Sequence, residues 1–300
     1  MEKIQDLQTQ PSSIAIKAKG VLALTKARLN LSVVYSAVAG YLLGADVFSI
    51  NILLLLAVGG YLVVGAANGF NQVIEKDRDA LMDRTMNRPL PTGVLTTMEA
   101  MIACTLMAFA GLWMLYLINP LTVGFGAFSL FMYVLVYTPL KAKGTIAVFV
   151  GAIPGAIPAL LGWVAATNDF DIEPGLLFAT QFLWQFAHFW AIAWIVDDDY
   201  KKAGYSLLPS GKRDGSSAMQ ILVYTLFTIP VSLLPFFGIT GTLSLSAVAA
   251  VLILGAGVFF LIKALKLYRT REVSDARKLM FASIIYLPVV QLIYVIDKYI

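Results

Sequence analysis

The run of sequence from residue 50 to residue 70 reads INILLLLAVGGYLVVGAANGF and contains no charged residue. A helix of about 20 apolar residues crosses the hydrocarbon core of a bilayer, so this run predicts a membrane span. Eight further apolar runs have similar lengths, at about residues 29–45, 98–118, 120–140, 145–167, 175–196, 217–238, 243–268 and 279–297. The pattern predicts an all-α, polytopic bundle of nine transmembrane helices, formed by a single domain over residues 1–300.

The composition agrees with this fold class. The chain is 59% apolar and only 13% charged, whereas an average soluble domain carries about 25% charged residues. These values exclude a soluble enzyme, a secreted disulfide scaffold and a disordered chain. The single cysteine, Cys104, excludes an internal disulfide and a cysteine-ligated zinc or iron–sulfur site. The single histidine, His188, excludes bis-histidine haem ligation within the chain.

Positive charge sets the expected orientation, because lysine and arginine are retained on the cytoplasmic side. All lysines and arginines except Lys298 fall before span one, in the connections after spans two, four, six and eight, or at the end of span eight. The N-terminus is therefore predicted to be cytoplasmic, with residues 1–28 as a cytoplasmic segment. That segment has neither a secretory leader nor an arginine-rich transit signal, which favours a bacterial plasma (inner) membrane.

Two predicted cytoplasmic connections, residues 68–99 and 197–216, stand out because together they carry half of the acidic side chains. One contains Leu-Pro-Thr-Gly at residues 90–93 and the other contains Leu-Pro-Ser-Gly at residues 208–211. Each of these motifs begins eleven residues after an aspartate, Asp79 or Asp197. This similarity predicts two related four-helix halves plus a ninth span, with both connections as active-site loops.

A polar stripe is expected at the end of span two. Asn68, Asn71, Glu75 and Asp79 are spaced by 3, 4 and 4 residues, which places them on one face of a helix. Amides and carboxylates arranged in this way suit Mg²⁺, with Mn²⁺ as the alternative ion. The competing interpretation is a helix end marked by solvated charges, but polar groups at membrane depth are costly and usually functional.

Cations follow the stripe closely. Arg84 and Arg88 are four residues apart, and guanidinium groups grip phosphate oxygens in a fixed fork. Tyr137 and Lys141 have the same spacing at the end of span four. All four residues are candidates to hold a diphosphate. The alternatives are cytoplasmic retention charges for the arginines and an interfacial aromatic beside a retention lysine for the second pair.

Span six carries the remaining polar residues at membrane depth. Gln181, Gln185, His188 and Asp199 share one face if the helix continues through Asp199. His188 is then a general base, an axial contact to a haem iron, or a core histidine bonded to a neighbouring helix. Trp184 belongs to an aromatic wall around it, which serves lipid contact, packing or the stabilisation of a passing cation.

These residues resemble the intramembrane prenyltransferase superfamily typified by UbiA, and within it the branch that farnesylates haem. Asn71, Glu75 and Asp79 occupy the three positions of the family's NxxxDxxxD motif, with glutamate in place of the middle aspartate. The branch is indicated by the stretches MDRTMNRPL at 82–90, YTPLK at 137–141, GAIPGAIP at 151–158, WQFAHFW at 184–190 and DDYKKAG at 198–204. The family's second motif, DxxxD, is incomplete, because Lys202 and Ala203 stand four residues after Asp198 and Asp199.

The resemblance implies an enzyme that transfers a farnesyl group from farnesyl diphosphate to a vinyl group of haem B. The farnesyl diphosphate is expected to enter from the lipid of the membrane. The resemblance also implies Mg²⁺ at Asn71, Glu75 and Asp79, with Asp198 or Asp199 opposite. Diphosphate oxygens are expected on Arg84, Arg88, Tyr137 and Lys141, with Lys202 replacing a metal charge. Asn68, Asn71, Asp79, Arg84, Arg88 and His188 are the expected catalytic residues, while His188, Gln185 and Trp184 are expected to contact haem. A downstream haem A synthase is the implied protein partner, and no nucleic acid is expected.

Two other kinds of function are compatible with parts of the sequence. A prenyltransferase for a quinone precursor or another aromatic acceptor would share the whole diphosphate site, and only His188 and its helix favour haem. A secondary transporter with related halves would need polar groups near the centre of several spans, whereas the acidic groups here gather at the cytoplasmic ends. A structural subunit of a respiratory complex would need neither acidic loop.

Overall fold

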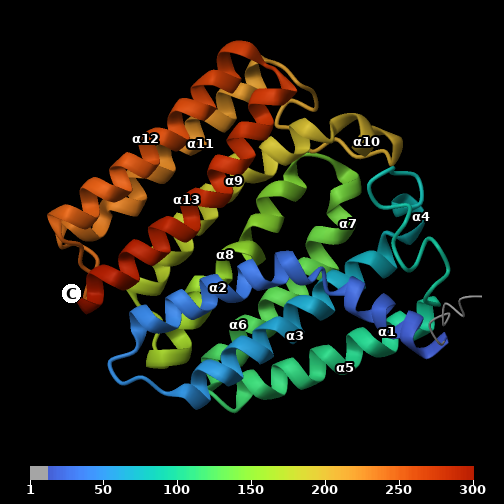
Figure 1. Cartoon of the computed structure of the whole chain (residues 1–300), viewed down its shortest axis with the longest axis horizontal. Coiled ribbons are helices and arrows are strands. Elements are labelled where there is room, and N and C mark those ends of the chain that lie inside the picture. The colour runs from blue at the N-terminus through green and yellow to red at the C-terminus, as the bar shows by residue number, and fades with distance from the viewer. Residues whose placement is uncertain (1–12) are drawn as a thin grey trace, which may run out of the picture.

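The computed structural model describes residues 13–300, and all regular secondary structure in these residues is helical. Nine long helices form its body, with four of the connections between them carrying short helical turns (Figure 1). The long helices are α2 (Ala27–Gly44), α3 (Ile50–Ile74), α5 (Thr97–Tyr116), α6 (Pro120–Phe131), α8 (Ile146–Thr167), α9 (Ile172–Ile195), α11 (Gly215–Leu233), α12 (Ala247–Thr270) and α13 (Val273–Tyr299). The others are α1 (Ser13–Leu24), α4 (Lys76–Asp79), the π-helix η1 (Met132–Tyr137), α7 (Thr138–Leu140), η2 (Lys141–Lys143), α10 (Asp197–Lys202) and η3 (Leu234–Phe237).

Eight helices or helical segments in the described residues are long and apolar enough to cross a membrane. The predicted span at 29–45 corresponds to α2, which reaches that standard only together with α1, from which it is bent by 46°. Arg28 and Asn30 near the start of α2 lower its hydropathy. The predicted count of nine therefore depends on counting α1 and α2 as one broken span. Residues 1–12 of the predicted cytoplasmic segment lie outside the described residues.

The helices form a closed ring. Each of the nine long helices contacts the next one along the chain, and α13 also contacts α2, which closes the ring. The closest approach between backbones joins α2 and α8 across it. A Cβ atom at Gly162 of α8 would lie 1.9 Å from the carbonyl oxygen of Ala37, and one at Gly40 would lie 1.9 Å from the carbonyl oxygen of Ala159. Only glycine permits this contact.

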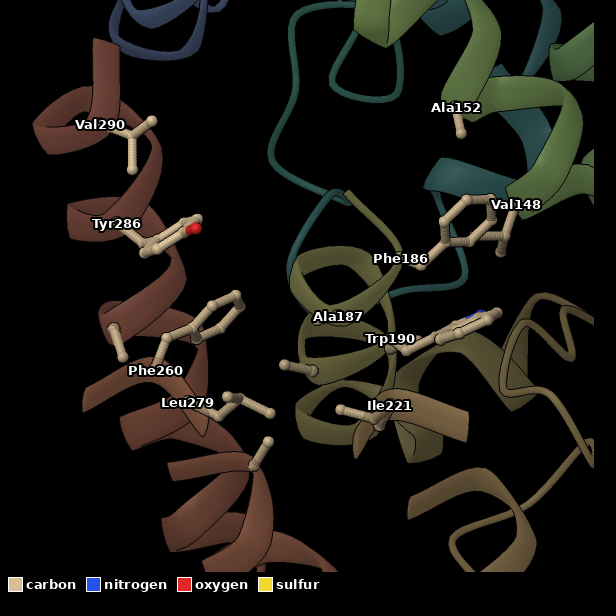
Figure 2. Packing of buried hydrophobic residues seen from close by; sticks show 14 of the residues in the cluster. Val148, Ala152, Phe186, Ala187, Trp190, Ile221, Phe260, Leu279, Tyr286 and Val290 are labelled. Carbon is tan, nitrogen blue, oxygen red and sulfur yellow. The ribbon is translucent and has the colours of Figure 1, made fainter. Parts of the chain in front are cut away.

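The largest buried apolar cluster joins α8 and α9 to the helices of the second half. In Figure 2, Phe186 and Trp190 of α9 point toward Val148 of α8, and their rings are 5.2 Å apart. On the other side of α9, Phe260 of α12 stacks on Tyr286 of α13 at 5.1 Å. Helix α9 is thus packed on several sides, which makes it a rigid support for side chains that face the interior.

Both acidic loops lie at the same end of the molecule, where α4 and α10 are neighbours (Figure 1). Helix α9 does not continue into the second loop. It ends at Ile195, Val196 departs from helical geometry, and α10 starts at Asp197. The helix face that the sequence analysis extended from His188 to Asp199 is therefore interrupted, and the contacts of Asp199 have to be taken from the structure.

Candidate active site

The polar stripe from α3 into α4 is buried along its whole length. Asn68, Asn71, Glu75 and Asp79 are each at most 3% exposed. Backbone hydrogen bonds from Glu75 to Asn71 and from Asp79 to Glu75 continue the helical turn across the break at Glu75. Asn71 donates its side-chain amide to the Thr138 hydroxyl at 3.2 Å, which ties the stripe to α7. Four polar side chains held in a row at this depth require polar partners.

Two buried ion pairs provide some of these polar partners. Arg88 donates to Asp79 at 2.7 Å, and Lys141 donates to Glu75 at 3.0 Å. Each carboxylate keeps a second buried oxygen, Oδ1 of Asp79 and Oε1 of Glu75, for which residues 13–300 provide no hydrogen-bond partner by distance and angle. An unpartnered buried carboxylate oxygen costs free energy unless a cation or a donor reaches it.

The two unpartnered carboxylate oxygens are of the ligand type that a Mg²⁺ site needs. Hard carboxylate oxygens are the ligands that this ion prefers, and it commonly takes only one or two of them besides substrate phosphates and water. The donor set of Glu75 and Asp79, with the amide of Asn71 beside them, therefore fits. Within residues 13–300, no three or more histidine, cysteine or acidic side chains lie together as a metal cluster. The five-residue ligand set expected from the sequence is thus not assembled into one cage in this structure.

Further cations surround the two pairs. Lys26, between α1 and α2, lies close enough to interact electrostatically with Arg88, Lys141, Glu75 and Asp79. From the sequence, Lys26 was predicted only to be a cytoplasmic retention charge, because no local motif distinguishes it from Lys17 or Lys19. Its backbone adopts the left-handed region with φ of 50°, which sets the bend between the two helices. The guanidinium of Arg84 is exposed and lies 5.7 Å from the ring centre of Tyr200.

Asp199 reaches across to the first loop. Its two carboxylate oxygens accept the backbone N–H groups of Asp83 at 2.8 Å and Arg84 at 3.2 Å. Lys202 forms ion pairs with the side chains of Asp83 and Asp199. We call this set of four residues the loop clasp. Burial raises the pKa of Asp199, but the two backbone N–H groups and Lys202 outweigh it and lower the pKa overall.

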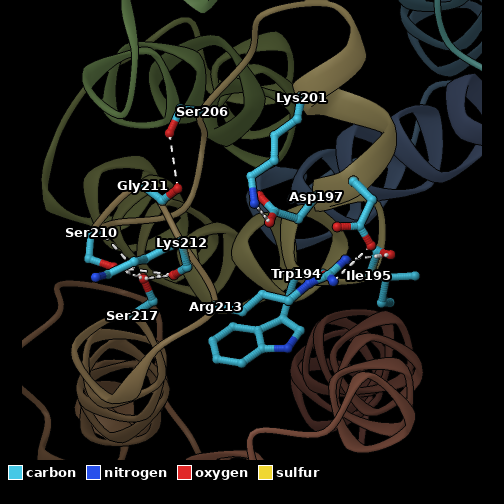
Figure 3. Close-up of polar contacts among 11 residues, drawn as sticks. Trp194, Ile195, Asp197, Lys201, Ser206, Ser210, Gly211, Lys212, Arg213 and Ser217 are labelled. Carbon is cyan, nitrogen blue, oxygen red and sulfur yellow. Dashed lines mark hydrogen bonds and ion pairs between the residues drawn. The ribbon is translucent and has the colours of Figure 1, made fainter.

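Asp198 turns away from the clasp. Its exposed carboxylate pairs with Arg213 at 2.9 Å. The same guanidinium donates to the carbonyl oxygen of Trp194 at 2.7 Å (Figure 3). The third aspartate of the run, Asp197, is the buried one and pairs with Lys201. The sequence analysis chose Asp198 and Asp199 as ligands, since nothing in the run DDD indicates which carboxylate turns inward.

A cavity of about 330 Å³ lies inside the ring beside the stripe. Its walls come from α2, α3, α6 with η1, α8, α9 and α13, and they are mostly apolar. The π-helical turn of η1 places Tyr133 and Tyr137 in this wall, with ring centres 5.2 Å apart. Single π-helical turns of this kind are frequent at functional sites. The polar residues that line the cavity include Asn68, Tyr137, Gln181, Trp184, Gln185 and His188.

The glutamines of α9 are bound to the wall of α8. Gln181 donates to the carbonyl oxygen of Gly155, and Gln185 donates to that of Ala152. Gly155 leaves the room for this contact, because a Cβ there would lie 2.0 Å from Gln185 Oε1. The Gln185 expected to contact haem is therefore also a structural link between α8 and α9.

Taken together, the site has two ends. One end holds buried carboxylates, unpartnered oxygens and several cations, which suits a diphosphate with a divalent ion. The other end is an apolar and aromatic cavity with a histidine, which suits a long hydrophobic chain and an acceptor with a large flat ring system. The structure brings Asn68, Asn71, Glu75, Asp79, Arg88 and Lys141 to the first end, and it places Gln185, Trp184 and His188 at the second.

Known proteins of similar sequence belong to one prenyltransferase family. Residues 33–285 match the UbiA prenyltransferase family. A protoheme IX farnesyltransferase from Christiangramia forsetii is 54% identical over 92% of this chain and 92% of its own. The protein of the same name from Flavobacterium psychrophilum is 52% identical over 92% of this chain and 93% of its own. One from Myxococcus xanthus is 40% identical over 94% and 95% of the two chains.

Solved structures share the fold at lower identity. A digeranylgeranylglyceryl phosphate synthase superposes with a TM-score of 0.77 at 19% identity, covering 94% of this chain and 98% of that one. A UbiA homologue from Archaeoglobus fulgidus, solved with GPP and Mg²⁺, superposes with a TM-score of 0.71 at 15% identity, covering 92% and 99% of the two chains. These likenesses, with the long apolar helices, show an integral membrane protein of this fold.

Proposed function

The chain belongs to the UbiA prenyltransferase family, and from this premise we propose that it transfers the farnesyl group of farnesyl diphosphate to a vinyl group of haem B, forming haem O. The observation that carries the proposal is the buried pairing of Glu75 and Asp79 with Lys141 and Arg88 at the edge of an apolar cavity that His188 also lines. The names of the relatives that match over nine-tenths of the chain support haem as the acceptor.

The diphosphate end uses the residues of the first loop and its neighbours. Asn71, Glu75 and Asp79 would hold Mg²⁺, which supplies positive charge to the departing diphosphate. Arg88 and Lys141, each already paired with one of these carboxylates, are placed to move onto phosphate oxygens as the substrate arrives. Arg84, Tyr137 and Lys202 complete the proposed set of diphosphate contacts. Asp198 and Asp199 stay predicted ligands from the second loop. The homologue solved with GPP and Mg²⁺ supports this type of substrate and ion.

In the transfer step, the bond between C1 of the farnesyl chain and its diphosphate oxygen breaks, and the electron pair leaves with the diphosphate. The allylic cation that develops is surrounded by aromatic rings, of which Tyr133 and Tyr137 line the cavity near the stripe. The π electrons of the vinyl group form the new carbon–carbon bond to C1. Water then adds to the carbocation on the side chain and loses a proton, which leaves the hydroxyl group of the product.

The apolar cavity protects this step. Its lining keeps bulk water away from the cation, which would otherwise be hydrolysed to farnesol. The arginines and lysines stabilise the leaving group in a place of low dielectric, where charge interactions are strong. Catalysis in this proposal therefore depends on the separation of a charged end from an apolar end within one ring of helices.

The orientation follows the distribution of positive charge. Nine spans with a cytoplasmic N-terminus would put both acidic loops on the cytoplasmic side of a bacterial inner membrane. Farnesyl diphosphate would then enter with its head group at the cytoplasmic surface. The product would remain in the bilayer for an enzyme that oxidises haem O further, for which a haem A synthase is the proposed partner.

A product assay tests the proposal directly. The purified full-length protein, in lipid nanodiscs with Mg²⁺, haem B and farnesyl diphosphate, is expected to form haem O, detected by mass spectrometry. Asp79→Asn should lower turnover about 100-fold or more, because it removes charge beside the departing diphosphate. Asp77→Asn, two residues away and exposed, is the matched control and should stay near wild-type turnover.

Two results would contradict the proposal. Wild-type turnover in Asp79→Asn would mean that the stripe does not carry the chemistry. Prenylation of a quinone precursor in place of haem B, under otherwise identical conditions, would favour the alternative acceptor class.

A further inference from the structure

His188 is bound to the last helix of the ring. Its Nδ1 lies 2.7 Å from the hydroxyl oxygen of Ser283 in α13. The Ser283 hydroxyl itself donates to the carbonyl oxygen of Met280 at 2.6 Å. Ser283 is fully buried, so its side chain has few other positions to adopt. No sequence motif pointed to Ser283, which is 95 residues from His188 along the chain.

These two hydrogen bonds assign the tautomer of the histidine. A serine hydroxyl has one hydrogen, and in Ser283 that hydrogen is used by Met280. The contact with His188 must therefore be donated by the histidine, so Nδ1 carries the ring proton. Nε2 is left with its lone pair. Within residues 13–300, the hydrogen bond given for the His188 ring is the one at Nδ1, and His188 is one of the residues that line the cavity.

Trp184 fixes the plane of the ring. The indole stacks on the imidazole with ring centres 4.8 Å apart and an angle of 13° between them. The indole N–H donates to the backbone oxygen of Ser283 at 2.7 Å. The same serine therefore orients both rings, one through its hydroxyl and the other through its carbonyl.

We infer that Ser283 is a positioning residue that holds His188 as the Nδ1–H tautomer and presents Nε2 to the iron of the haem acceptor. This inference rests on the proposed function, since it needs haem B in the cavity. Iron here belongs to the substrate. Histidine ligands to metals almost always donate their other ring N–H to a nearby acceptor, which is the arrangement that Ser283 provides.

The surroundings favour a ligand over a general base. A histidine that accepts a proton becomes a cation, and active sites usually stabilise that cation with a carboxylate at the other nitrogen. Here the partner is a neutral hydroxyl that already donates elsewhere. Two aromatic rings, Trp184 and Phe189, also lie against the imidazole, with ring centres 4.8 and 5.6 Å away. A neutral imidazole that coordinates iron needs no such charge.

Resonance Raman spectroscopy of the ferrous haem B complex tests the inference in the full-length protein. The wild type should show an iron–histidine stretching band, which His188→Ala should lose and added imidazole should restore. Ser283→Ala should shift and weaken this band, and should raise the Kd for haem B about 10-fold, the usual lower bound for loss of an outer partner of a metal ligand. Ser232→Ala is the matched control and should keep the band, because Ser232 is fully buried in α11, does not line the cavity within residues 13–300, and donates its hydroxyl to a backbone carbonyl three residues earlier, as Ser283 does.

The outcomes separate this inference from the proposed function. A wild-type protein that makes haem O but shows no iron–histidine band overturns the inference and leaves the function standing. An unchanged band in Ser283→Ala, with wild-type Kd, overturns the role of Ser283. A wild-type protein that makes no haem O overturns the function itself. The wild-type spectrum tests the ligand without any variant, so misfolding of a variant cannot hide a negative result.

Discussion

At the scale of single residues, the active-site carboxylates are held in place by partners that come from distant parts of the chain. Glu75 meets Lys141 and Asp79 meets Arg88, so each negative charge at membrane depth is balanced by a positive one. Removing one member of such a pair leaves an uncompensated buried charge, which is costly. Asp79→Asn also removes the charge, but it keeps the size of the side chain and an acceptor oxygen for Arg88, so it disturbs the packing less than truncation does.

Asp214 offers a residue-scale prediction about pH. It caps the N-terminus of α11 and accepts the backbone N–H of Ser217 at 2.9 Å. This bond, with a smaller contribution from the Ser210 hydroxyl, lowers the pKa of Asp214 below its ordinary value of 3.8. A lowered folded-state pKa means that the cap is fully effective above the ordinary value and is lost as the pH falls through the folded value.

We therefore expect Asp214→Ala to lower the melting temperature by a constant amount between about pH 5 and pH 8. The difference from the wild type should shrink as the pH falls below 3.8 and through the lower folded-state pKa of Asp214. Thermal unfolding in detergent across this range measures it. Ser49→Ala, which removes an uncharged cap from α3, is the control and should show no acid transition of this kind.

At the scale of elements, the loop clasp joins α10 of the second half to the first acidic loop. Asp199 receives two backbone N–H groups from that loop, and Lys202 adds ion pairs. This contact holds the segment that carries Arg84 and Arg88 over the site. A role in positioning that loop is thus the one that the geometry of Asp199 supports most directly, while its metal role stays a prediction.

Hydrogen exchange distinguishes the two roles of Asp199. Hydrogen bonds to a charged group contribute about 1.5–3 kcal/mol, so Asp199→Ala should speed amide exchange at Asp83 and Arg84 about 10-fold or more. Asp198→Ala, whose carboxylate is exposed and paired with Arg213, should leave these two amides unchanged. Unchanged exchange in Asp199→Ala, together with a raised requirement for Mg²⁺ in turnover, would instead identify Asp199 as a metal ligand.

The contact between α2 and α8 gives a second prediction for the elements. A methyl group at Gly162 would meet the carbonyl oxygen of Ala37, which is backbone and cannot turn aside. Gly162→Ala should therefore destabilise the protein by about 1–3 kcal/mol, the usual cost of overpacking. Gly124→Ala in α6, where nothing lies within 4 Å of the added methyl, should be neutral or slightly stabilising. Melting temperatures in detergent compare the two, and equal losses would contradict the close contact.

At the scale of the whole molecule, the ring of helices encloses the cavity and gathers both acidic loops at one end (Figure 1). Because the loops meet through the clasp, they must lie on the same side of the membrane. The charge distribution predicts that this side is cytoplasmic. The predicted relation between the two halves is compatible with the ring but is not required by it.

Cysteine labelling in intact bacterial cells measures the orientation. The native Cys104 is buried, so its background labelling should be low. Cysteine placed by Asp77→Cys or Lys212→Cys should react with an impermeant maleimide only after the membrane is opened. Asp46→Cys and Asp169→Cys, exposed residues in connections at the opposite end of the spans, should react in intact cells. Labelling of both groups in intact cells would overturn the nine-span orientation.

Much of the fold was predictable because membrane insertion is a local property of the chain. An apolar run of sufficient length becomes a helix in a bilayer whatever its neighbours do, since every backbone polar group must be paired within the segment. The predicted runs accordingly correspond to the long helices. The exception is the span predicted at 29–45, because α2 qualifies as a membrane span only together with α1, from which it is bent at Lys26. The polar stripe was also predictable, because its spacing lies within one helix.

The order of residues along the chain was therefore enough to predict the class of protein, the helices and the charged residues within them. The partners of those charges became clear only from the packed helices: Asp199 binds the first loop, Asp198 pairs with Arg213, Lys26 joins the site and Ser283 contacts His188. The reason is physical. Spacing along a helix constrains neighbours three or four residues apart, whereas these partners are brought together by the packing of helices whose contacts leave no local trace in the chain.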